Sequence, residues 1–363
     1  MAKIVHIADI DLNPTSGMGR VGYHWKIAFE NAGHEFVHIG KKEIGKTSHP
    51  SQFPRLARSY FIEKLNGTAD VILAHEPVSG FFTKYQIPVV LFSHGIEQRE
   101  WELRLSKYKR YYEPVSLRSR VLFPLWRLRP CNKGLRGSKI LLLSNSEDKS
   151  FVAKRFKRRD QDTFVFRNGI YPGYFKNSKS DLEETETCTI AFNGTWIKRK
   201  GIDLLVRAAS ILAQRGVKVK WFLFGVVFPK DQVLAAFPEN LHDQIEVVSL
   251  YKPEEEQDLY SKAEIFVLPS FFEGQSLALL QAMASQMCCI TSSCCAQIDL
   301  IKHMQNGLLF NPGDATDLAN QLQFAVENKS TRQKLAANAQ ASVQDYRWES
   351  VSEEIVNIVK AVL

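Results

Sequence analysis

Short apolar runs alternate with amphipathic stretches along the first half of the chain. Lys3 to Ile10 and Glu35 to Ile39 are apolar, and Gly19 to Ala32 between them has the spacing of a helix. Further runs of strand length are Asp70 to Ala74, Pro88 to Ser93, Lys139 to Ser144 and Thr163 to Phe166. Strands that alternate with helices predict a parallel sheet that helices cover on both faces.

The same alternation returns after a polar segment. Asn177 to Thr187 contains almost no residue that a core could bury, so we expect a linker there. Apolar residues from Ile202 to Leu212 then follow helical spacing, and Gly216 is a suitable helix end. One apolar run of strand length, Thr189 to Asn193, precedes this helix. Four more follow it, at Lys220 to Phe224, Ile245 to Ser249, Glu264 to Leu268 and Cys288 to Thr291. We therefore expect a second doubly wound unit.

The length of 363 residues suits two domains of roughly 150 residues each. We assign residues 1–176 to an N-terminal Rossmann-like domain, 177–187 to the linker and 188–345 to a C-terminal Rossmann-like domain, with a cleft between the domains. The end of the chain, from Thr331, is mainly helical in pattern. Its apolar side chains, among them Trp348, predict that residues 346–363 pack back on the first domain.

Composition indicates a globular protein. The hydrophobic share is 45% and the charged share 24%, both ordinary values. The longest apolar runs, such as Ile140 to Leu143, are far shorter than the roughly 20 residues of a membrane span. The first residues lack the apolar region of a signal peptide, so we expect a cytoplasmic location. The six cysteines have no paired histidines at zinc-site spacing, so we expect buried, reduced thiols and no metal site.

The formal net charge of +8 favours an anionic partner. Basic residues with interleaved aromatic residues are concentrated from Arg99 to Lys139. This segment could lie against the anionic inner face of a membrane, as in a peripheral protein, or form a solvated helical pair beside the acceptor. Nucleic acid is disfavoured because no recognised binding module is present.

The first candidate site is the glycine-rich stretch Gly17 to Gly22, which formally matches G-x-G-x-x-G. A dinucleotide-binding fold has the first glycine directly after the strand and an acid at the end of the second strand. Here Asp11 to Ser16 intervene, and the second strand ends with Gly40, Lys41 and Lys42. A dinucleotide-dependent oxidoreductase is therefore disfavoured. The glycines and the helix start still suit an anionic group, and the alternative is a turn without a ligand.

Three other stretches follow strand ends, where open α/β sheets bind ligands. His94 comes directly after one buried strand. In the stretch from Gly194 to Gly201 another strand is followed by Lys198, Arg199 and Lys200 at the start of a helix, where a bound diphosphate would offset the charge of the cations. In the third, Glu273 and Gly274 precede a helix whose free amides can bind phosphate oxygens.

In this order, the stretches resemble the retaining GT-B glycosyltransferases of glycosyltransferase family 4. The family pattern is E-x7-E with an upstream G-R…K-G segment, and the likeness covers nearly the whole chain. It is strongest from Phe192 to Asp314, which includes Asn306 to Phe310 as a counterpart of N-G-x-L-[VF]. Arg167 to Ile170 is similar to the P-N-G-[VI] segment of the family.

The resemblance implies a GT-B fold and a nucleoside-diphosphate sugar as donor, with neither a cofactor nor a metal. It implies that Lys200 binds the diphosphate, that Glu273 contacts the transferred sugar and that His94 lies beside the sugar. The anomeric configuration would be retained, with the departing phosphate accepting the acceptor's proton. The remaining donor-binding positions would be Gly17, Gly19, Gly194, Thr195, Arg199, Gly274, Gln275, Ser276, Leu277 and Gln281.

Two positions depart from the family pattern. Gln281 stands where the family usually has a ribose-binding glutamate, and Thr195 stands where it usually has a phosphate-binding arginine. We expect a transferase that acts on a glycan or lipid-linked acceptor in cell-surface polysaccharide or glycolipid synthesis. The departures leave open a non-catalytic binding protein of the same fold. A nucleotide-sugar epimerase is a further alternative, although no additional acid and base carboxylates can be placed.

Overall fold

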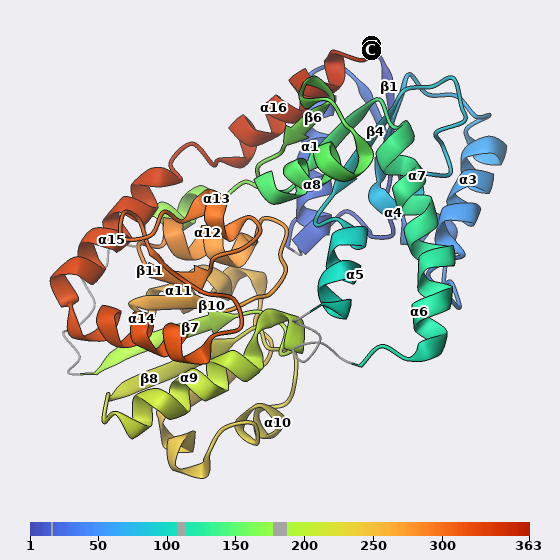
Figure 1. Ribbon diagram of the computed structural model, residues 1–363. Coiled ribbons are helices and arrows are strands. Elements are labelled where there is room, and N and C mark those ends of the chain that lie inside the picture. The colour runs from blue at the N-terminus through green and yellow to red at the C-terminus, as the bar shows by residue number, and fades with distance from the viewer. Residues whose placement is uncertain (16, 107–113, 177–186) are drawn as a thin grey trace. The chain divides into compact units, whose positions relative to one another are not determined.

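The computed structural model describes residues 1–15, 17–106, 114–176 and 187–363. Within them the chain forms two compact units (Figure 1). The first comprises Met1–Lys107, Pro114–Gly169 and Trp348–Leu363, and the second contains Ile170–Arg347. The chain thus enters the second unit after Gly169, whereas the linker expected at 177–187 lies, except for its last residue, outside the described residues.

The first unit contains a six-stranded parallel sheet in the order β2-β1-β3-β4-β5-β6. Its strands are β1 (Lys3–Ile7), β2 (Glu35–Ile39), β3 (Val71–His75), β4 (Val89–Ser93), β5 (Ile140–Leu143) and β6 (Thr163–Val165). Each lies within or beside an apolar run, because strands buried on both faces need continuous apolar sequence. The predicted strands of this half are confirmed.

Helices follow the strands of the first unit. They are α1 (Gly17–Asn31), α2 (Lys41–Ile44), α3 (Phe53–Lys64), α4 (Glu76–Ser79), α5 (Glu97–Leu105), α6 (Leu117–Phe123), the π-helix η2 (Pro124–Leu128), α7 (Arg129–Gly137) and α8 (Ser146–Phe156). Segments α6, η2 and α7 follow one another without a break. Most of the described part of the basic segment is therefore helical, and nothing is described for residues 107–113.

The last helix, α16 (Trp348–Lys360), belongs to the first unit and packs against α1. The Trp348 ring stacks on the His24 ring with centroids 4.2 Å apart. A side chain at Gly169 would collide with Trp348, so the glycine lets the chain pass beside this helix. The expected return of the C-terminal helix is confirmed, although the helix begins at Trp348 and not at residue 346.

The second unit contains another six-stranded parallel sheet, in the order β12-β11-β10-β7-β8-β9. Its strands are β7 (Cys188–Asn193), β8 (Val219–Phe224), β9 (Ile245–Val248), β10 (Ile265–Leu268), β11 (Cys288–Ser292) and β12 (Leu308–Phe310). Side chains alternate between two cores: Ile190 and Phe192 enter one, and Ala191 between them enters the other. Strand β12 was not predicted from the sequence because three residues give too short a pattern.

Helices lie on both faces of the second sheet (Figure 1). They are α9 (Ile202–Gln214), α10 (Lys230–Leu234), α11 (Glu256–Ser261), α12 (Leu277–Ala284), α13 (Gln297–Leu300), α14 (Ala315–Glu327) and α15 (Lys329–Ser342). Five of the six cysteines are buried, as expected, and Cys294 is half-buried. Within the described part of the chain, no helix has the length and apolar character needed to span a bilayer.

Candidate functional site

The reversal of strand order in the second sheet occurs between β7 and β10, which pair side by side. Ligands of open α/β sheets bind outside the carboxyl ends of the strands at such a reversal. The loop after β7 holds Gly194 to Lys200, and the loop after β10 holds Ser270 to Glu273. The topology therefore brings together two stretches that are far apart in the sequence.

Lys200 and Glu273 form an ion pair between these two loops. The Lys200 Nζ atom lies 2.7 Å from Glu273 Oε1, and both side chains are mostly buried. Arg199 Nη1 lies farther from the same carboxylate, at 3.8 Å from Oε2, and donates to the backbone carbonyl of Phe272 at 2.6 Å. The two cations predicted to bind a diphosphate thus lie beside the carboxylate predicted to contact the sugar.

Backbone contacts fix this arrangement. The Phe271 amide donates to the Arg199 carbonyl at 3.0 Å, which joins the two loops. Gly201, with φ 76°, lies so close to Pro269 that an added Cβ would be 2.0 Å from the Pro269 carbonyl oxygen. Glycine is required there both for its left-handed backbone and for the close approach. Lys200 directly precedes this glycine, so the close contact positions the lysine.

The Glu273 carboxyl is ionised in this setting. Burial alone would raise its pKa, but the neighbouring charges of Lys200 and Arg199 and hydrogen bonds from Lys200 and Ser270 together hold the pKa below its ordinary value. A buried carboxylate needs such partners because an unpaired charge in the interior is costly. A ligand diphosphate would compete with Glu273 for the same two cations and release its carboxylate toward sugar hydroxyl groups.

The start of α12 carries further residues that the sequence predicts to contact a donor. Gly274 to Ser276 lead into this helix, and Ser276 caps it by accepting from the Leu279 amide at 3.4 Å. Gln275 is buried, whereas Gly274, Ser276 and Leu277 are half-exposed. Gly194 and Thr195 are also half-exposed at the end of β7. Amides at a helix start can bind anionic oxygens, so these positions remain predicted donor contacts.

Gln281 lies inside a buried polar network. Its side chain is 3% exposed. Its amide nitrogen donates to Glu256 Oε2 at 3.0 Å and to the Tyr174 hydroxyl at 2.8 Å. Its carbonyl accepts from the Tyr260 hydroxyl at 3.1 Å. The carboxylate of this network therefore belongs to Glu256, and the ribose contact of Gln281 remains a prediction.

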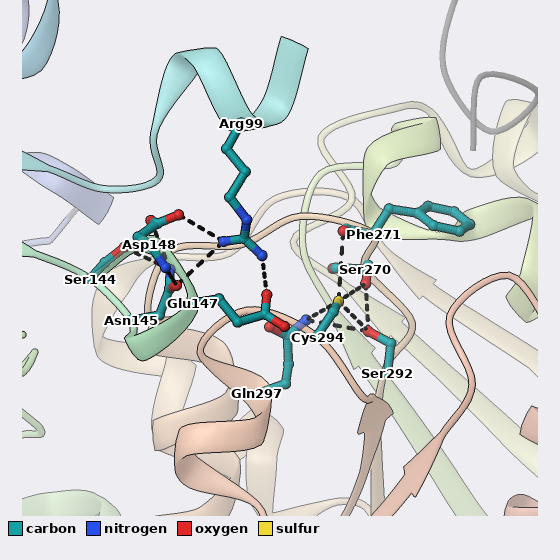
Figure 2. A network of polar contacts seen from close by, with 10 residues as sticks. All are labelled: Arg99, Ser144, Asn145, Glu147, Asp148, Ser270, Phe271, Ser292, Cys294 and Gln297. Carbon is teal, nitrogen blue, oxygen red and sulfur yellow. Dashed lines mark hydrogen bonds and ion pairs between the residues drawn. The ribbon is translucent and has the colours of Figure 1, made fainter. Parts of the chain in front are cut away.

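Figure 2 shows the side chains that support the loop carrying Glu273. The Ser292 hydroxyl donates to the Ser270 carbonyl at 2.5 Å, and Gln297 donates to Ser292 at 3.3 Å. The Cys294 thiol lies 3.6 Å from the carbonyl oxygens of both Ser270 and Phe271. These contacts hold the backbone before Glu273 from the next strand of the sheet, a role that the sequence pattern did not indicate.

His94 belongs to the first unit, where it follows β4. Burial lowers its pKa to about 4, so the imidazole is neutral at physiological pH. The ring packs edge-on against Phe166 with centroids 5.4 Å apart. Its Nε2 atom is buried without a hydrogen-bond partner among the described residues. A neutral imidazole with a nitrogen available could contact a sugar hydroxyl.

Glu76, the first residue of α4, lies close to the strand that precedes His94. Its carboxyl accepts from the Ser93 hydroxyl at 2.7 Å and from the Glu97 amide at 3.3 Å. Burial, and secondarily the Glu97 charge, raises the pKa of Glu76 to about 8. Glu76 is therefore largely protonated at neutral pH. No sequence pattern pointed to this group, because its burial depends on packing.

The predicted glycines Gly17 and Gly19 lie in the first turn of α1. Gly19 is buried, whereas Gly17 is exposed, and a Cβ added at Gly17 would have no atom within 4 Å. Tight packing occurs instead at Gly22, where an added Cβ would be 2.7 Å from the Leu12 side chain. No contact within the described part of the chain accounts for glycine at position 17, so its ligand contact remains a prediction.

Partly buried ion pairs connect the basic segment to its own unit. Arg99 forms ion pairs with Glu147 and with Asp148, the latter at 2.7 Å (Figure 2). Arg127 pairs with Glu97. These cations are committed to internal carboxylates, so only part of the positive charge from Arg99 to Lys139 faces solvent.

One group of described residues has metal-ligand chemistry: Asp11, His38 and Glu43. Each is engaged within the chain. Asp11 accepts from the Lys42 amide at 2.9 Å, Glu43 accepts from the Gly40 amide at 2.7 Å, and His38 Nε2 lies 3.0 Å from the Ile10 carbonyl. These hydrogen bonds explain why the three side chains lie together: they bind the backbone at the start of α2 and in the loops beside it.

Residues 175–342 match the family model for glycosyl transferases group 1. An uncharacterized glycosyltransferase from Methanocaldococcus jannaschii is 24% identical over 227 residues, which cover 59% of this chain and 58% of that protein. The capsular polysaccharide biosynthesis glycosyltransferase CapM from Staphylococcus aureus is 21% identical over 234 residues, which cover 62% of each chain. The matches thus span less than two thirds of these curated relatives.

Solved structures show the same fold. A sucrose-phosphate synthase from Thermosynechococcus elongatus has a TM-score of 0.78 at 16% identity, covering 100% of this chain and 99% of that one. The expected GT-B fold class is confirmed. The second unit carries a group 1 glycosyltransferase domain, as the segment match shows.

Proposed function

We propose that this chain, whose second unit carries a group 1 glycosyltransferase domain, transfers a sugar from a nucleoside-diphosphate sugar to a hydroxyl acceptor. The observation that carries the proposal is the Lys200–Glu273 pair, 2.7 Å apart, at the strand-order reversal of the second sheet. This pair offers a cation for phosphate beside a carboxylate for sugar hydroxyls. The start of α12 adds backbone amides from the same side of the sheet.

In the proposed reaction the bond between the anomeric carbon and the diphosphate oxygen breaks as the acceptor oxygen bonds to that carbon on the same face. The acceptor's proton passes to the departing diphosphate. Lys200 and Arg199 stabilise the developing negative charge without a metal ion, and Glu273 orients the sugar. The neutral imidazole of His94 contacts a hydroxyl group of the sugar.

We propose a glycan or lipid-linked acceptor and a role in polysaccharide or glycolipid synthesis, on the cytoplasmic side of a membrane. The name of the CapM relative supports the polysaccharide side of this proposal. The basic segment from Arg99 to Lys139 supports contact with an anionic membrane surface, through its solvent-facing cations.

The test is thermal denaturation in EDTA with a panel of nucleoside diphosphates and nucleotide-sugars. A ligand at about 100 times its Kd adds roughly 2.7 kcal/mol of stability. We expect stabilisation by one nucleotide class, lost in Lys200→Ala and Glu273→Ala and kept in Lys230→Ala, which removes an exposed cation elsewhere in the second unit. Absence of stabilisation by every member of the panel would contradict the proposal.

The buried position of Gln281 favours one second candidate, a binding protein that no longer catalyses transfer. Such a protein would be stabilised by nucleotides but would release no nucleoside diphosphate from any donor. An epimerase would convert the donor sugar and likewise release no nucleoside diphosphate. Measuring stabilisation, release and conversion of the donor sugar therefore separates the three functions.

A further inference from the structure

Helix α6 and the π-helix after it carry exposed aliphatic side chains at helical spacing. Leu117 is 81% exposed, Val121 63% and Leu125 59%. They recur every four residues, so they lie along one side of the helical segment. Helix α6 extends away from the sheet of the first unit (Figure 1). Contiguous exposed apolar residues of this kind mark an interaction surface more often than isolated ones do.

The opposite side of this segment anchors it to the first unit. The Phe123 ring stacks on Trp101 with centroids 4.5 Å apart. Trp126 packs edge-on against Phe123 and against His49, with centroids 5.4 and 4.7 Å away. Trp101 is only 6% exposed. The described aromatic residues thus hold the helix in place, and the aliphatic residues, not the aromatic ones, form its outer surface.

A cationic pocket adjoins the aliphatic side and shares Leu125 with it. The pocket has a volume of about 370 Å³ and no acidic residue in its lining. Its four cations come from α3, α7 and the loop after α4: Arg58, Lys84, Arg129 and Lys133. The backbone is tightly packed at its base, where a side chain at Gly80 would collide with Pro130. The pocket is therefore a fixed part of the unit.

The cations of this pocket lack acidic partners among the described residues. Arg58 donates to the Tyr85 hydroxyl at 3.0 Å and lies over the Tyr85 ring, which orients its guanidinium. Burial, and then the charges of Lys84 and Arg58, lower the pKa of Lys133. Like charges held close together repel one another, so a bound anion would stabilise all of them.

We propose that this face of the first unit docks on the surface of an anionic phospholipid bilayer. The four cations bind headgroup phosphates, and Leu117, Val121 and Leu125 enter the interface beside them. Apolar insertion next to cationic contacts is the combination that peripheral membrane proteins use. Two of the cations, Arg58 and Lys84, lie outside the basic segment from Arg99 to Lys139. This surface deepens the membrane contact proposed above and rests on it. Docking itself requires neither donor nor acceptor, so its failure would leave the proposed transfer reaction standing.

The charge component is tested by sedimentation of the full chain with vesicles. Binding is expected with mixed phosphatidylglycerol and phosphatidylcholine vesicles and not with phosphatidylcholine alone. Lys84→Gln combined with Lys133→Gln should weaken vesicle binding about 25-fold, because each cation near the surface strengthens binding about fivefold. The matched control, Lys218→Gln with Lys334→Gln, removes two exposed cations from the second unit and should leave binding unchanged.

The apolar component is tested with the double variant Leu117→Ser and Val121→Ser. The control is Leu250→Ser, which changes an exposed aliphatic side chain in the second unit. All three side chains are exposed, so the fold should persist, which circular dichroism checks. Only the α6 pair should reduce vesicle binding. Equal loss in pocket and control variants would overturn the proposal. The proposal would also be overturned if inorganic phosphate stabilised the chain but the chain did not bind vesicles. A third contrary result would be that the chain self-associates and that Leu117→Ser with Val121→Ser only dissociates this assembly.

Discussion

At the scale of single residues, Gln281 shows how a substitution changes a buried network. Where the family pattern has glutamate, the amide of Gln281 bridges Glu256, Tyr174 and Tyr260. The Glu256 carboxylate also accepts from the Tyr174 and Tyr251 hydroxyls, so three neutral donors share one carboxylate. A second carboxylate at position 281 would lie where an amide nitrogen now donates to Glu256 at 3.0 Å. This arrangement explains in physical terms why glutamine suits position 281.

We predict that Gln281→Glu destabilises the chain more at pH 8 than at pH 5. Two buried carboxylates that share a site cannot both ionise at low cost, and the loss at pH 8 should be roughly 3 kcal/mol. Urea unfolding at both pH values measures the effect. Gln281→Leu, which adds no charge, should lower the free energy of unfolding by a similar amount at both pH values. A Gln281→Glu variant that is as stable as the wild type at pH 8 would contradict this account of the network.

Glu76 gives a second prediction at this scale. Its pKa is about 8 in the folded chain, against an ordinary value of 4.5. Between these values the folded chain keeps a proton that the unfolded chain has lost, so stability falls as pH rises. We expect the stability of wild type, minus that of Glu76→Gln, to decrease between pH 5 and 8 by up to about 1.4 kcal/mol per pH unit. Urea titrations that give a constant difference would contradict the burial of a protonated Glu76.

At the scale of secondary-structure elements, the link between η6 (Lys198–Lys200) and α9 depends on one glycine. Gly201 combines a φ of 76° with close contact to Pro269. Gly216, after α9, has a similar φ of 72° but no atom within 4 Å of an added Cβ. The two glycines therefore separate the cost of backbone conformation from the cost of steric contact.

We predict that Gly201→Ala destabilises the chain by about 1–3 kcal/mol more than Gly216→Ala. Both substitutions incur the left-handed cost of about 1–2 kcal/mol, and only the first adds overpacking. Gly201→Ala should also weaken nucleotide binding, because it displaces Lys200. Equal free energies of unfolding for the two variants would show that the contact with Pro269 does not constrain this loop.

Periodicity was sufficient to predict most elements, because buried parallel strands are continuous apolar runs and their helices are amphipathic. It missed β12, which has three residues, and could not find contacts between side chains distant in sequence. The loops that bear Lys200 and Glu273 were identified from their motifs, but their ion pair follows from the pairing of β7 with β10. Glu76 and Glu256 were not predicted, since glutamates usually lie on the surface and only packing shows which of them are buried.

At the scale of the whole molecule, the first unit is built from separated segments, and its last segment is α16. The helix packs on α1 and buries Trp348, Val351, Ile355, Val356 and Val359. The second unit takes all its described residues from Ile170–Arg347. Stability of the first unit thus depends on the two ends of the chain, whereas that of the second does not.

We predict that deletion of residues 348–363 destabilises the first unit selectively. Burial of each large apolar side chain contributes about 1.5–3 kcal/mol, so the loss is comparable to the stability of a whole domain. Hydrogen exchange should show lost protection in β1 and β3, with β7 and β8 still protected. Lost protection in the second unit to the same extent, or in neither unit, would contradict this division.

The proposed function requires the second unit to bind a nucleotide-sugar through Lys200 and Glu273 and to transfer its sugar without a metal. The most direct measurement is release of nucleoside diphosphate from purified donors in EDTA, with water or an added glycan as acceptor. We predict release from one donor class by the wild type and by Lys230→Ala, with rates at least about 100-fold lower in Lys200→Ala and Glu273→Gln. No release from any donor, or equal release by Lys200→Ala and the wild type, would contradict the proposed function.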